Sequence, residues 1–332
     1  MRHLGRPAYR RLVFVLLAFG AIGTAFASPR DWLQRMGDAV ELRNYRGTLV
    51  HMSDGQADVL QIVHRVDESG VTERITANQG AGREIIRNND EITCIFPDQQ
   101  VVLVEERDDR DSAQNPLGGR LPSHGRISEK NYELISQGEG KMIGRRAEII
   151  AIRPRDSYRY GYRIWLDQPT AMPLKSQLLD EQGMVVEEIM FSEISLPDEI
   201  ALAHTKPSLE IGSFTWRRSE PMDETAPRID GGRWRATELP DGFMLAAVRS
   251  KGGTATAQPM EQLVYSDGLA SVSVFIEPGV AAAEQAEGRS RIGAANAYTT
   301  TMEGRLVTAV GEVPVKTAKM IALSVRPVSG TP

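Results

Sequence analysis

The 332-residue sequence contains a single cysteine, Cys94, and this scarcity excludes two classes of protein. One thiol cannot form an intramolecular disulfide framework, and it cannot support a cysteine-rich zinc module. Basic residues are not in excess either, because the chain has 39 Lys and Arg and 44 Asp and Glu, which gives a formal net charge of −5. We therefore expect no nucleic-acid partner. The 30 glycines and 18 prolines follow no period, which excludes a collagen-like chain.

The chain also lacks a catalytic signature. It contains no G-x-S-x-G, no H-E-x-x-H and no complete P-loop sequence. Gly80 and Gly82 lack the third glycine of a dinucleotide-binding fingerprint, and a predicted strand rather than a helix follows them. His51 and His64 lie on predicted strands, where packing or solvent exposure is commoner than metal binding. We expect no enzyme, no metal site and no cofactor.

One apolar run stands out, and it lies at the amino terminus. Residues 12–22 are apolar apart from Gly20, and the A-x-A sequence that ends at Ala27 follows them. Four arginines precede the run: Arg2, Arg6, Arg10 and Arg11. This order predicts a secretory signal peptide at residues 1–27, since the run is shorter than the roughly 20 residues of a membrane span. Without these arginines the mature chain has a net charge of −9, and we expect it to be soluble and periplasmic.

The mature chain opens with a helix signature. Ser28 is a suitable N-cap, Pro29 suits the first turn, and Asp31 favours the positive end of a helix. The apolar residues that follow share one helical face: Trp32, Leu33, Met36, Ala39 and Val40.

Short segments rich in Val, Ile and Thr then follow one another between turn sequences, which predicts an antiparallel meander. The predicted strands are residues 47–52, 57–66, 71–78, 82–88, 91–96, 100–105, 132–137, 145–153, 160–167, 172–180 and 184–194. Cys94 lies in one of them, and we interpret it as a buried small apolar residue rather than a nucleophile. The charged, Pro- and Gly-containing stretch from Glu105 to Lys130 interrupts the pattern and predicts a mobile loop.

The sequence predicts two domains of mainly β, α+β structure. The first spans residues 28–196, and a polar linker spans 197–213 and stays irregular to about residue 233. The second domain spans residues 214–328 and ends in a helix that begins at Pro314. Its predicted strands are residues 243–250, 262–266, 270–276, 296–302 and 305–311.

Clusters of basic and aromatic residues are the best candidates for a binding site. The first cluster lies within residues 153–163, and two more flank the linker. The candidate residues are Arg155, Tyr158, Arg159, Tyr160, Trp216, Arg217, Arg218, Arg233 and Arg235. Arginine forks bind phosphate or carboxylate groups, so the clusters suit a partner or lipid that carries them. The alternative is a solvated strand face with ordinary packing tryptophans.

Nine short motifs, in this order along the chain, resemble the MucB/RseB family of periplasmic negative regulators of the envelope-stress sigma factor, of the sigma-E/AlgU type. They are residues 44–48 (NYRGT), 82–87 (GREIIR), 93–97 (TCIFP), 155–162 (RDSYRYGY), 165–167 (WLD), 172–176 (MPLKS), 239–243 (LPDGF), 265–275 (YSDGLASVSVF) and 310–314 (VGEVP). No single motif is diagnostic, but together they cover most of the mature chain.

The resemblance implies an amino-terminal domain similar to lipoprotein carriers of the LolA type, which is a half-open antiparallel β-barrel with helices, and a smaller carboxy-terminal α+β domain. It also implies that the protein binds the periplasmic domain of a membrane anti-sigma factor of the RseA/MucA type. That binding protects the anti-sigma factor from regulated proteolysis, and lipopolysaccharide or another lipid signal releases the regulator. The family carries no catalytic residues.

A second function stays open at this point, namely a periplasmic lipid or lipoprotein carrier. Its barrel would hold acyl chains, at about 0.8 kcal/mol for each buried CH₂ group. The second domain argues against it, because a carrier needs only the barrel. The sequence also leaves open whether the protein forms homo-oligomers. We expect partner and lipid to compete at a cleft between the domains, beside the linker.

Overall fold

The computed structural model describes residues 27–77, 82–88, 91–106, 117, 121–122, 127–218, 232–251, 260–278 and 287–328. The predicted signal peptide lies outside the described residues except for Ala27, and so does most of the predicted loop 105–130.

Helix α1 (Pro29–Leu42) begins where the sequence predicts. The Asp31 amide donates a hydrogen bond to Ser28 Oγ (3.2 Å), and the Ser28 amide donates one to Asp31 Oδ2 (2.9 Å). This reciprocal capping box satisfies N–H groups that a helix end leaves without partners. The buried face of α1 consists of Leu33, Met36, Ala39 and Val40, and it packs against one face of the large sheet. We call this the inner face.

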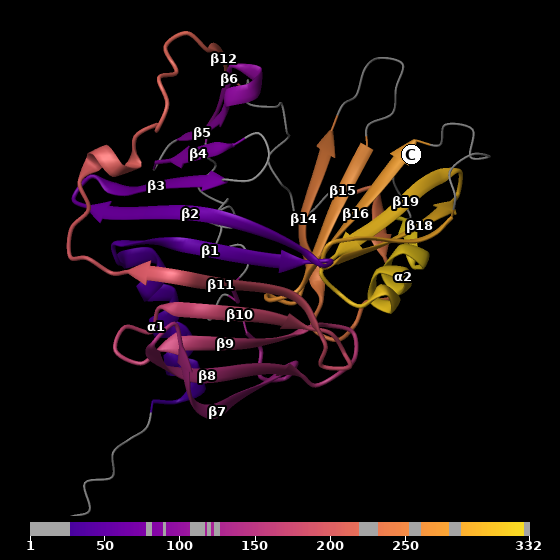
Figure 1. Ribbon diagram of the computed structural model, residues 1–332. Coiled ribbons are helices and arrows are strands. Elements are labelled where there is room, and N and C mark those ends of the chain that lie inside the picture. Colours follow the sequence, from indigo (N-terminus) through magenta and orange to yellow (C-terminus); the bar gives the residue numbers. More distant parts are fainter. Residues whose placement is uncertain are drawn as a thin grey trace, which may run out of the picture.

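Twelve strands form that large sheet, which is antiparallel except at one edge (Figure 1). In their order across the sheet, the strands are β12 (Thr215–Arg218), β6 (Val101–Glu106), β5 (Glu91–Phe96), β4 (Glu84–Arg87), β3 (Gly70–Ala77), β2 (Gln56–Asp67), β1 (Tyr45–Ser53), β11 (Val185–Ser195), β10 (Pro173–Leu179), β9 (Gly161–Asp167), β8 (Arg145–Pro154) and β7 (Tyr132–Met142). The edge strands β12 and β7 do not pair with each other, so the sheet stays open. The short helix η1 (Pro97–Gln99) connects β5 and β6.

The second domain contains a sheet of six strands and one helix. Across this sheet the strands are β14 (Met244–Lys251), β15 (Met260–Ser266), β16 (Ser271–Pro278), β19 (Arg305–Gly311), β18 (Ala295–Met302) and β17 (Gly288–Ile292). Helix α2 (Val315–Leu323) packs against it, and β13 (Trp234–Ala236) pairs with β20 (Val325–Pro327). The predicted fold class is confirmed, with mainly β structure, an open first sheet and a smaller α+β domain.

Residues 197–214, which we call the strap, run along the first domain rather than hanging free between the domains. Four side chains in or next to the large sheet bind the backbone of the strap. Asn44 Nδ2 donates to the carbonyl of Asp198 (2.8 Å), and Arg65 Nε donates to the carbonyl of Ile200 (3.0 Å). Arg74 Nη1 donates to the carbonyl of Lys206 (3.1 Å), and the Glu84 carboxylate accepts from the Ser208 amide (3.0 Å). The strap includes the short helix η4 (Leu202–Thr205).

The strap ends at β12, where the structure differs from the predicted division of the chain. Strand β12 pairs in parallel with β6, and the Thr215 amide donates to the carbonyl of Gln100 (2.8 Å). The strand therefore extends the first sheet, although the prediction assigned residues 214–218 to the second domain. Within the predicted connection, residues 219–231 lie outside the described part.

Candidate functional site

Arg159, a predicted binding residue, lies at the junction of the two domains and is completely buried. Its Nη1 donates to Asp267 Oδ2 of the second domain (2.5 Å), and its Nη2 donates to the carbonyl of Asp241 (2.6 Å). Within its own domain, the Nε donates to Asp156 Oδ1 (3.1 Å). A fully buried guanidinium is stable only when such partners satisfy it. Arg159 thus contacts the second domain directly.

Tyr132 completes this polar cluster. Its hydroxyl donates to Asp267 Oδ2 (2.8 Å), so one carboxylate oxygen accepts from both Tyr132 and Arg159. Burial raises the pKa of Tyr132 far above its ordinary value, and the negative charge of Asp267 raises it further. The hydroxyl therefore keeps its proton and remains a donor. The centre of the Phe243 ring lies 5.2 Å from the Arg159 guanidinium.

The neighbouring residues Tyr158 and Tyr160 also join the domains. The carbonyl of Tyr158 accepts from Thr317 Oγ1 (2.6 Å), and its ring lies 5.2 Å from Lys316 Nζ. The hydroxyl of Tyr160 accepts from Asn296 Nδ2 (2.8 Å). Both contacts reach into the second domain, so three of the four candidates in this cluster belong to the junction.

The domains also approach each other closely at Gly242. Its φ of +83° favours glycine, and a Cβ atom at this position would lie only 2.1 Å from Asn131 Nδ2 of the first domain. Any other residue there would strain the backbone and displace the Asn131 side chain. Arg155, the fourth candidate of the cluster, contacts its own domain instead, since its Nε donates to the carbonyl of Glu129 (3.0 Å).

The candidates beside the linker fall into two separate places. Trp216, Arg217 and Arg218 lie on the edge strand β12, where all are exposed, and the Trp216 side chain is 55% exposed. Arg218 Nη1 donates to Glu91 Oε1 (2.7 Å), whereas the Arg217 side chain forms no hydrogen bond or ion pair with another described residue. This edge is the most accessible of the predicted sites.

Arg233 and Arg235 belong to the second domain, at β13. The Arg233 amide donates to Glu261 Oε2 (3.2 Å), and its Nε lies 3.5 Å from the same oxygen. Arg235 is exposed, while Trp234 between them is buried in the second core. This pair therefore belongs to the second domain, whereas the β12 cluster lies at the edge of the first sheet.

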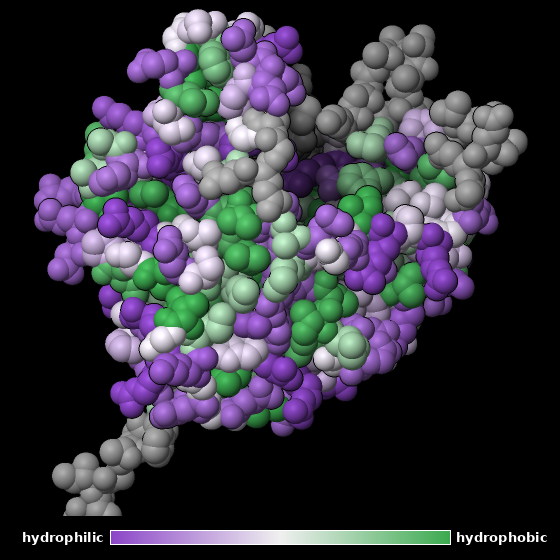
Figure 2. Space-filling model, viewed as in Figure 1, coloured by the Kyte–Doolittle hydropathy of each residue, from purple (hydrophilic) through white to green (hydrophobic). Residues whose placement is uncertain are grey.

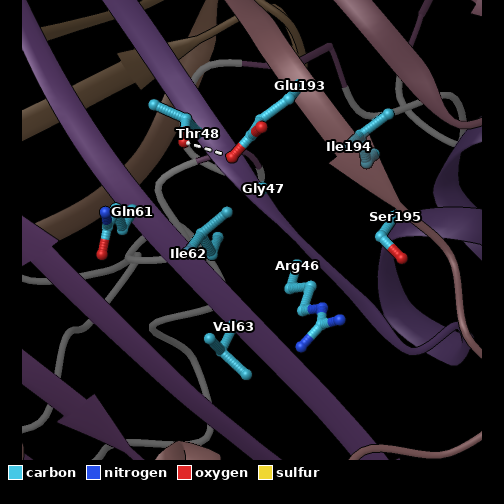
Figure 3. A pocket seen from close by; sticks show the side chains of 9 residues that line it. All are labelled: Arg46, Gly47, Thr48, Gln61, Ile62, Val63, Glu193, Ile194 and Ser195. Carbon is cyan, nitrogen blue, oxygen red and sulfur yellow. Dashed lines mark hydrogen bonds between the residues drawn. The ribbon is translucent and has the colours of Figure 1, made fainter.

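A shallow hollow of about 390 Å³ opens on the large sheet where β1, β2 and β11 meet (Figure 3). Arg46, Thr48 and Glu193 line it, and Thr48 Oγ1 donates to Glu193 Oε1 (3.2 Å). A Cβ atom at Gly47 would lie 2.4 Å from the carbonyl oxygen of Glu193, so only glycine fits between these strands. The motif 44–48 thus lies at this hollow, although sequence reasoning did not identify a site there.

The surface of the large sheet is mixed rather than uniformly polar. Apolar patches lie between hydrophilic ones over its strands (Figure 2). In this sheet Val50 lies opposite Met190 on one side and opposite Val59 on the other, and all three are half-buried. Such a surface suits contacts with a protein or a lipid better than contacts with a highly charged polymer.

The described residues include neither a cluster of metal-ligating side chains nor a membrane-spanning helix. Within those residues, no three His, Cys, Asp or Glu side chains gather as a potential metal site. None of the described helices has the length and apolar character that a membrane crossing requires.

Sequence reasoning missed the second-domain side of the junction. Asp241, Gly242 and Asp267 lie in motifs that carried the family resemblance, but nothing in their spacing indicates that they meet Arg159. Pairings between residues more than 80 positions apart leave no local pattern. The only available signal was that polar residues with turn glycines recur in both motifs.

The fold and these contacts define a two-domain, mainly β protein whose surfaces are suited to binding. The family model of the MucB/RseB N-terminal domain matches residues 28–209, and that of the MucB/RseB C-terminal domain matches residues 229–326. The chain belongs to the MucB/RseB family, whose characterised members are sigma factor regulatory proteins.

Individual relatives match over nearly the whole length. The sigma factor AlgU regulatory protein MucB of Pseudomonas aeruginosa is 32% identical over 329 residues, covering 96% of this chain and 98% of MucB. The sigma-E factor regulatory protein RseB of Escherichia coli K12 is 25% identical, covering 95% of this chain and 96% of RseB.

Solved structures show the same architecture. A complex of Pseudomonas aeruginosa MucA and MucB matches with a TM-score of 0.69 at 30% identity, covering 91% of this chain and 99% of that chain. A crystal structure of MucB with MucA(peri) gives a TM-score of 0.67 and covers 90% and 99%, respectively. A structure of MucB determined by itself gives 0.57, also at 30% identity, and covers 90% and 97%.

Proposed function

We propose that this protein is a periplasmic regulator that binds the periplasmic domain of a membrane anti-sigma factor of the RseA/MucA type. By binding, it shields the anti-sigma factor from regulated proteolysis and so represses the envelope-stress sigma factor. The observation that carries this proposal is the similarity of both domains to MucB, a protein crystallised with MucA(peri). On this proposal the protein is not an enzyme.

The fit to the solved structures supports the same conclusion. The TM-scores with the two MucA-bound structures, 0.69 and 0.67, exceed the score of 0.57 with MucB by itself, at equal identity and almost equal coverage. The fold of this chain is therefore at least as similar to the partner-bound relative as to MucB by itself.

The predicted site residues take two roles in this proposal. Trp216, Arg217 and Arg235 are exposed and can contact the partner or a lipid, because aromatic and arginine side chains dominate binding surfaces. Arg159 and Tyr160 position the domains instead. Arg155, Tyr158, Arg218 and Arg233 have intramolecular contacts that a ligand would have to displace.

Release by lipopolysaccharide or another lipid completes the proposed function. A lipid releases the partner only if it binds the partner-free state more tightly. Moving the complex from 99% formed to 1% formed needs a bias of about 5.5 kcal/mol. Acyl chains buried on the protein would gain about 0.8 kcal/mol for each CH₂ group, so a few methylenes together with phosphate contacts could supply this bias.

A protease-protection assay tests the proposed function. The periplasmic domain of the anti-sigma factor is incubated with the first regulatory protease, with and without this protein. We expect cleavage to slow when the protein is present and to resume when lipopolysaccharide is added. Equal cleavage rates in all three reactions contradict the proposal.

Two further measurements address the alternatives. A pull-down from periplasm distinguishes a regulator, which retains an anti-sigma fragment, from a lipid or lipoprotein carrier, which retains lipoproteins. The intact mass of the exported protein tests the signal peptide, because we expect a chain that starts at Ser28. A mass that includes residues 1–27 would overturn the predicted cleavage.

A further inference from the structure

A second hollow, of about 440 Å³, lies in the first domain beside the junction. Its walls are the loop that connects β8 to β9, which includes Asp156, and the turn between β10 and β11 around Asp180. Three arginines line it, namely Arg153, Arg159 and Arg163. None of its lining residues comes from the second domain, so the hollow is complete within the first domain.

Arg163 is the unusual residue of this hollow. It is half-buried on β9, and its Nε is buried with no hydrogen-bond partner among the described residues. Gln177 lies directly opposite on β10, and its amide nitrogen donates to Glu188 Oε2 (2.5 Å). Its carbonyl oxygen Oε1, the atom that could accept from Arg163, is also buried without a partner among the described residues. A buried donor without a partner is costly, so an oxygen of a bound ligand would stabilise Arg163 at this hollow.

The charges around the hollow leave Arg153 and Arg163 available. Arg159 is occupied by Asp156, Asp267 and the carbonyl of Asp241, as described above. The Oδ1 atom of Asp180 accepts from the amides of Gln182 and Met184. Arg153 forms only a 3.6 Å ion pair with Glu133, and both side chains are about half exposed. Glu181 is exposed in the turn between β10 and β11. An anion with more than one charge can therefore compete for both arginines.

We propose that this hollow binds a phosphate ester, whose oxygens bridge Arg153 and Arg163. The two residues lie on adjacent strands, since Arg163 is opposite Ala151 and Arg153 is two residues further along β8. One arginine fork satisfies both oxygens of a carboxylate, whereas a tetrahedral phosphate offers oxygens to two separate guanidinium groups. The volume accommodates the phosphate together with its ester group. This site does not depend on the proposed partner binding.

The test is calorimetric titration of the full-length mature protein at low ionic strength with glycerol 3-phosphate and with inorganic phosphate. Vesicles of phosphatidylcholine with and without phosphatidic acid form a third arm, which distinguishes a lipid headgroup from a soluble ester. The variants are Arg163→Gln, Arg153→Gln and Arg163→Lys. Arg249→Gln is the matched control, because Arg249 also has a buried Nε without a partner but lies on β14 of the second domain.

We expect saturable binding of the phosphate probes by the wild type. Arg163→Gln and Arg153→Gln each weaken it about tenfold, while Arg163→Lys keeps part of it through its charge and Arg249→Gln leaves it unchanged. Arg163→Lys keeps the test decisive if Arg163→Gln does not fold. Binding that is equal in wild type and in Arg163→Gln overturns the proposal, and so does the absence of saturable binding in every arm.

Discussion

At the residue scale, the structure shows why a cluster that sequence identifies as a ligand site can instead hold the molecule together. Arg159 has the guanidinium group and the basic and aromatic sequence neighbours of an anion-binding residue, and it does bind a carboxylate. That carboxylate is Asp267 of the same chain, 108 residues away. Sequence indicates the chemistry of such a residue but not whether its partner is internal, because the pairing depends on the tertiary fold.

The ion pair between the half-buried Arg145 and the buried Asp167 gives a prediction at this scale. Asp167 accepts from Arg145 Nε (2.8 Å) and Nη2 (3.0 Å) and from Thr170 Oγ1 (2.6 Å). Partial burial alone would raise the pKa of Asp167, but these bonds outweigh it and hold the pKa below the ordinary value of 3.8. The ionised form therefore stabilises the fold above that value, and the contribution is lost as pH falls through the folded-state pKa.

We expect Arg145→Met to lower the free energy of unfolding by about 1–2 kcal/mol at pH 7, since Asp167 loses its charged partner. The difference from wild type should shrink in urea titrations as the pH is lowered below 3.8. The neighbouring Arg146 is exposed, so Arg146→Met is the control. A difference that stays constant down to the lowest pH would show that the ion pair is not its source.

Cys94 gives a second prediction. The thiol is half-buried in β5, and burial raises its pKa, with a further contribution from the charge of Glu105. Since the thiolate is the reactive form, we expect slow reaction with a thiol reagent in the native protein and fast reaction in urea. Cys94→Ala should cost about 1–2 kcal/mol at most. Equally fast native labelling would contradict the interpretation of Cys94 as a packing residue.

At the element scale, most strands were predictable, whereas the short strands β12, β13, β17 and β20 and the strap were not. Strands β5 and β19 have the predicted bounds, 91–96 and 305–311, because alternating β-branched residues between turns mark them locally. Strand β12 was missed because it is four residues long, polar and exposed, and its partner β6 lies more than 100 residues earlier. Sheet-edge pairing of this kind has no hydrophobic pattern to reveal it.

Glu84 allows a test of the strap. This buried carboxylate accepts from the amide (3.0 Å) and the hydroxyl (3.1 Å) of Ser208 and lies 3.5 Å from Arg74 Nε. We expect Glu84→Ala to lower the free energy of unfolding by about 2–3 kcal/mol, because it leaves these donors without an acceptor. Limited proteolysis should then cut within residues 197–214. Glu210→Ala, at an exposed position of the same strap, is the control, and the protease should cleave it at the same rate as wild type.

At the scale of the whole molecule, the junction makes two domains into one unit. Arg159, Tyr132 and Asp267 form its buried polar centre, and Gly242 permits the close approach. We expect Arg159→Met to uncouple the domains, because Asp267 then stays buried without its charged partner. Calorimetric unfolding should change from one transition to two, and the radius of gyration from small-angle scattering should increase. Arg155→Met, which changes a contact within the first domain only, should do neither.

The measurement that tests the regulator assignment most directly is a calorimetric titration of the mature protein with the periplasmic domain of the anti-sigma factor from the same organism. We expect saturable binding with a Kd of about 1 μM or tighter, which corresponds to about −8 kcal/mol. Arg159→Met should weaken this binding, because the two domains no longer keep the arrangement that the junction holds. An absence of saturable binding by the folded wild-type protein would contradict the assignment as an anti-sigma-binding regulator.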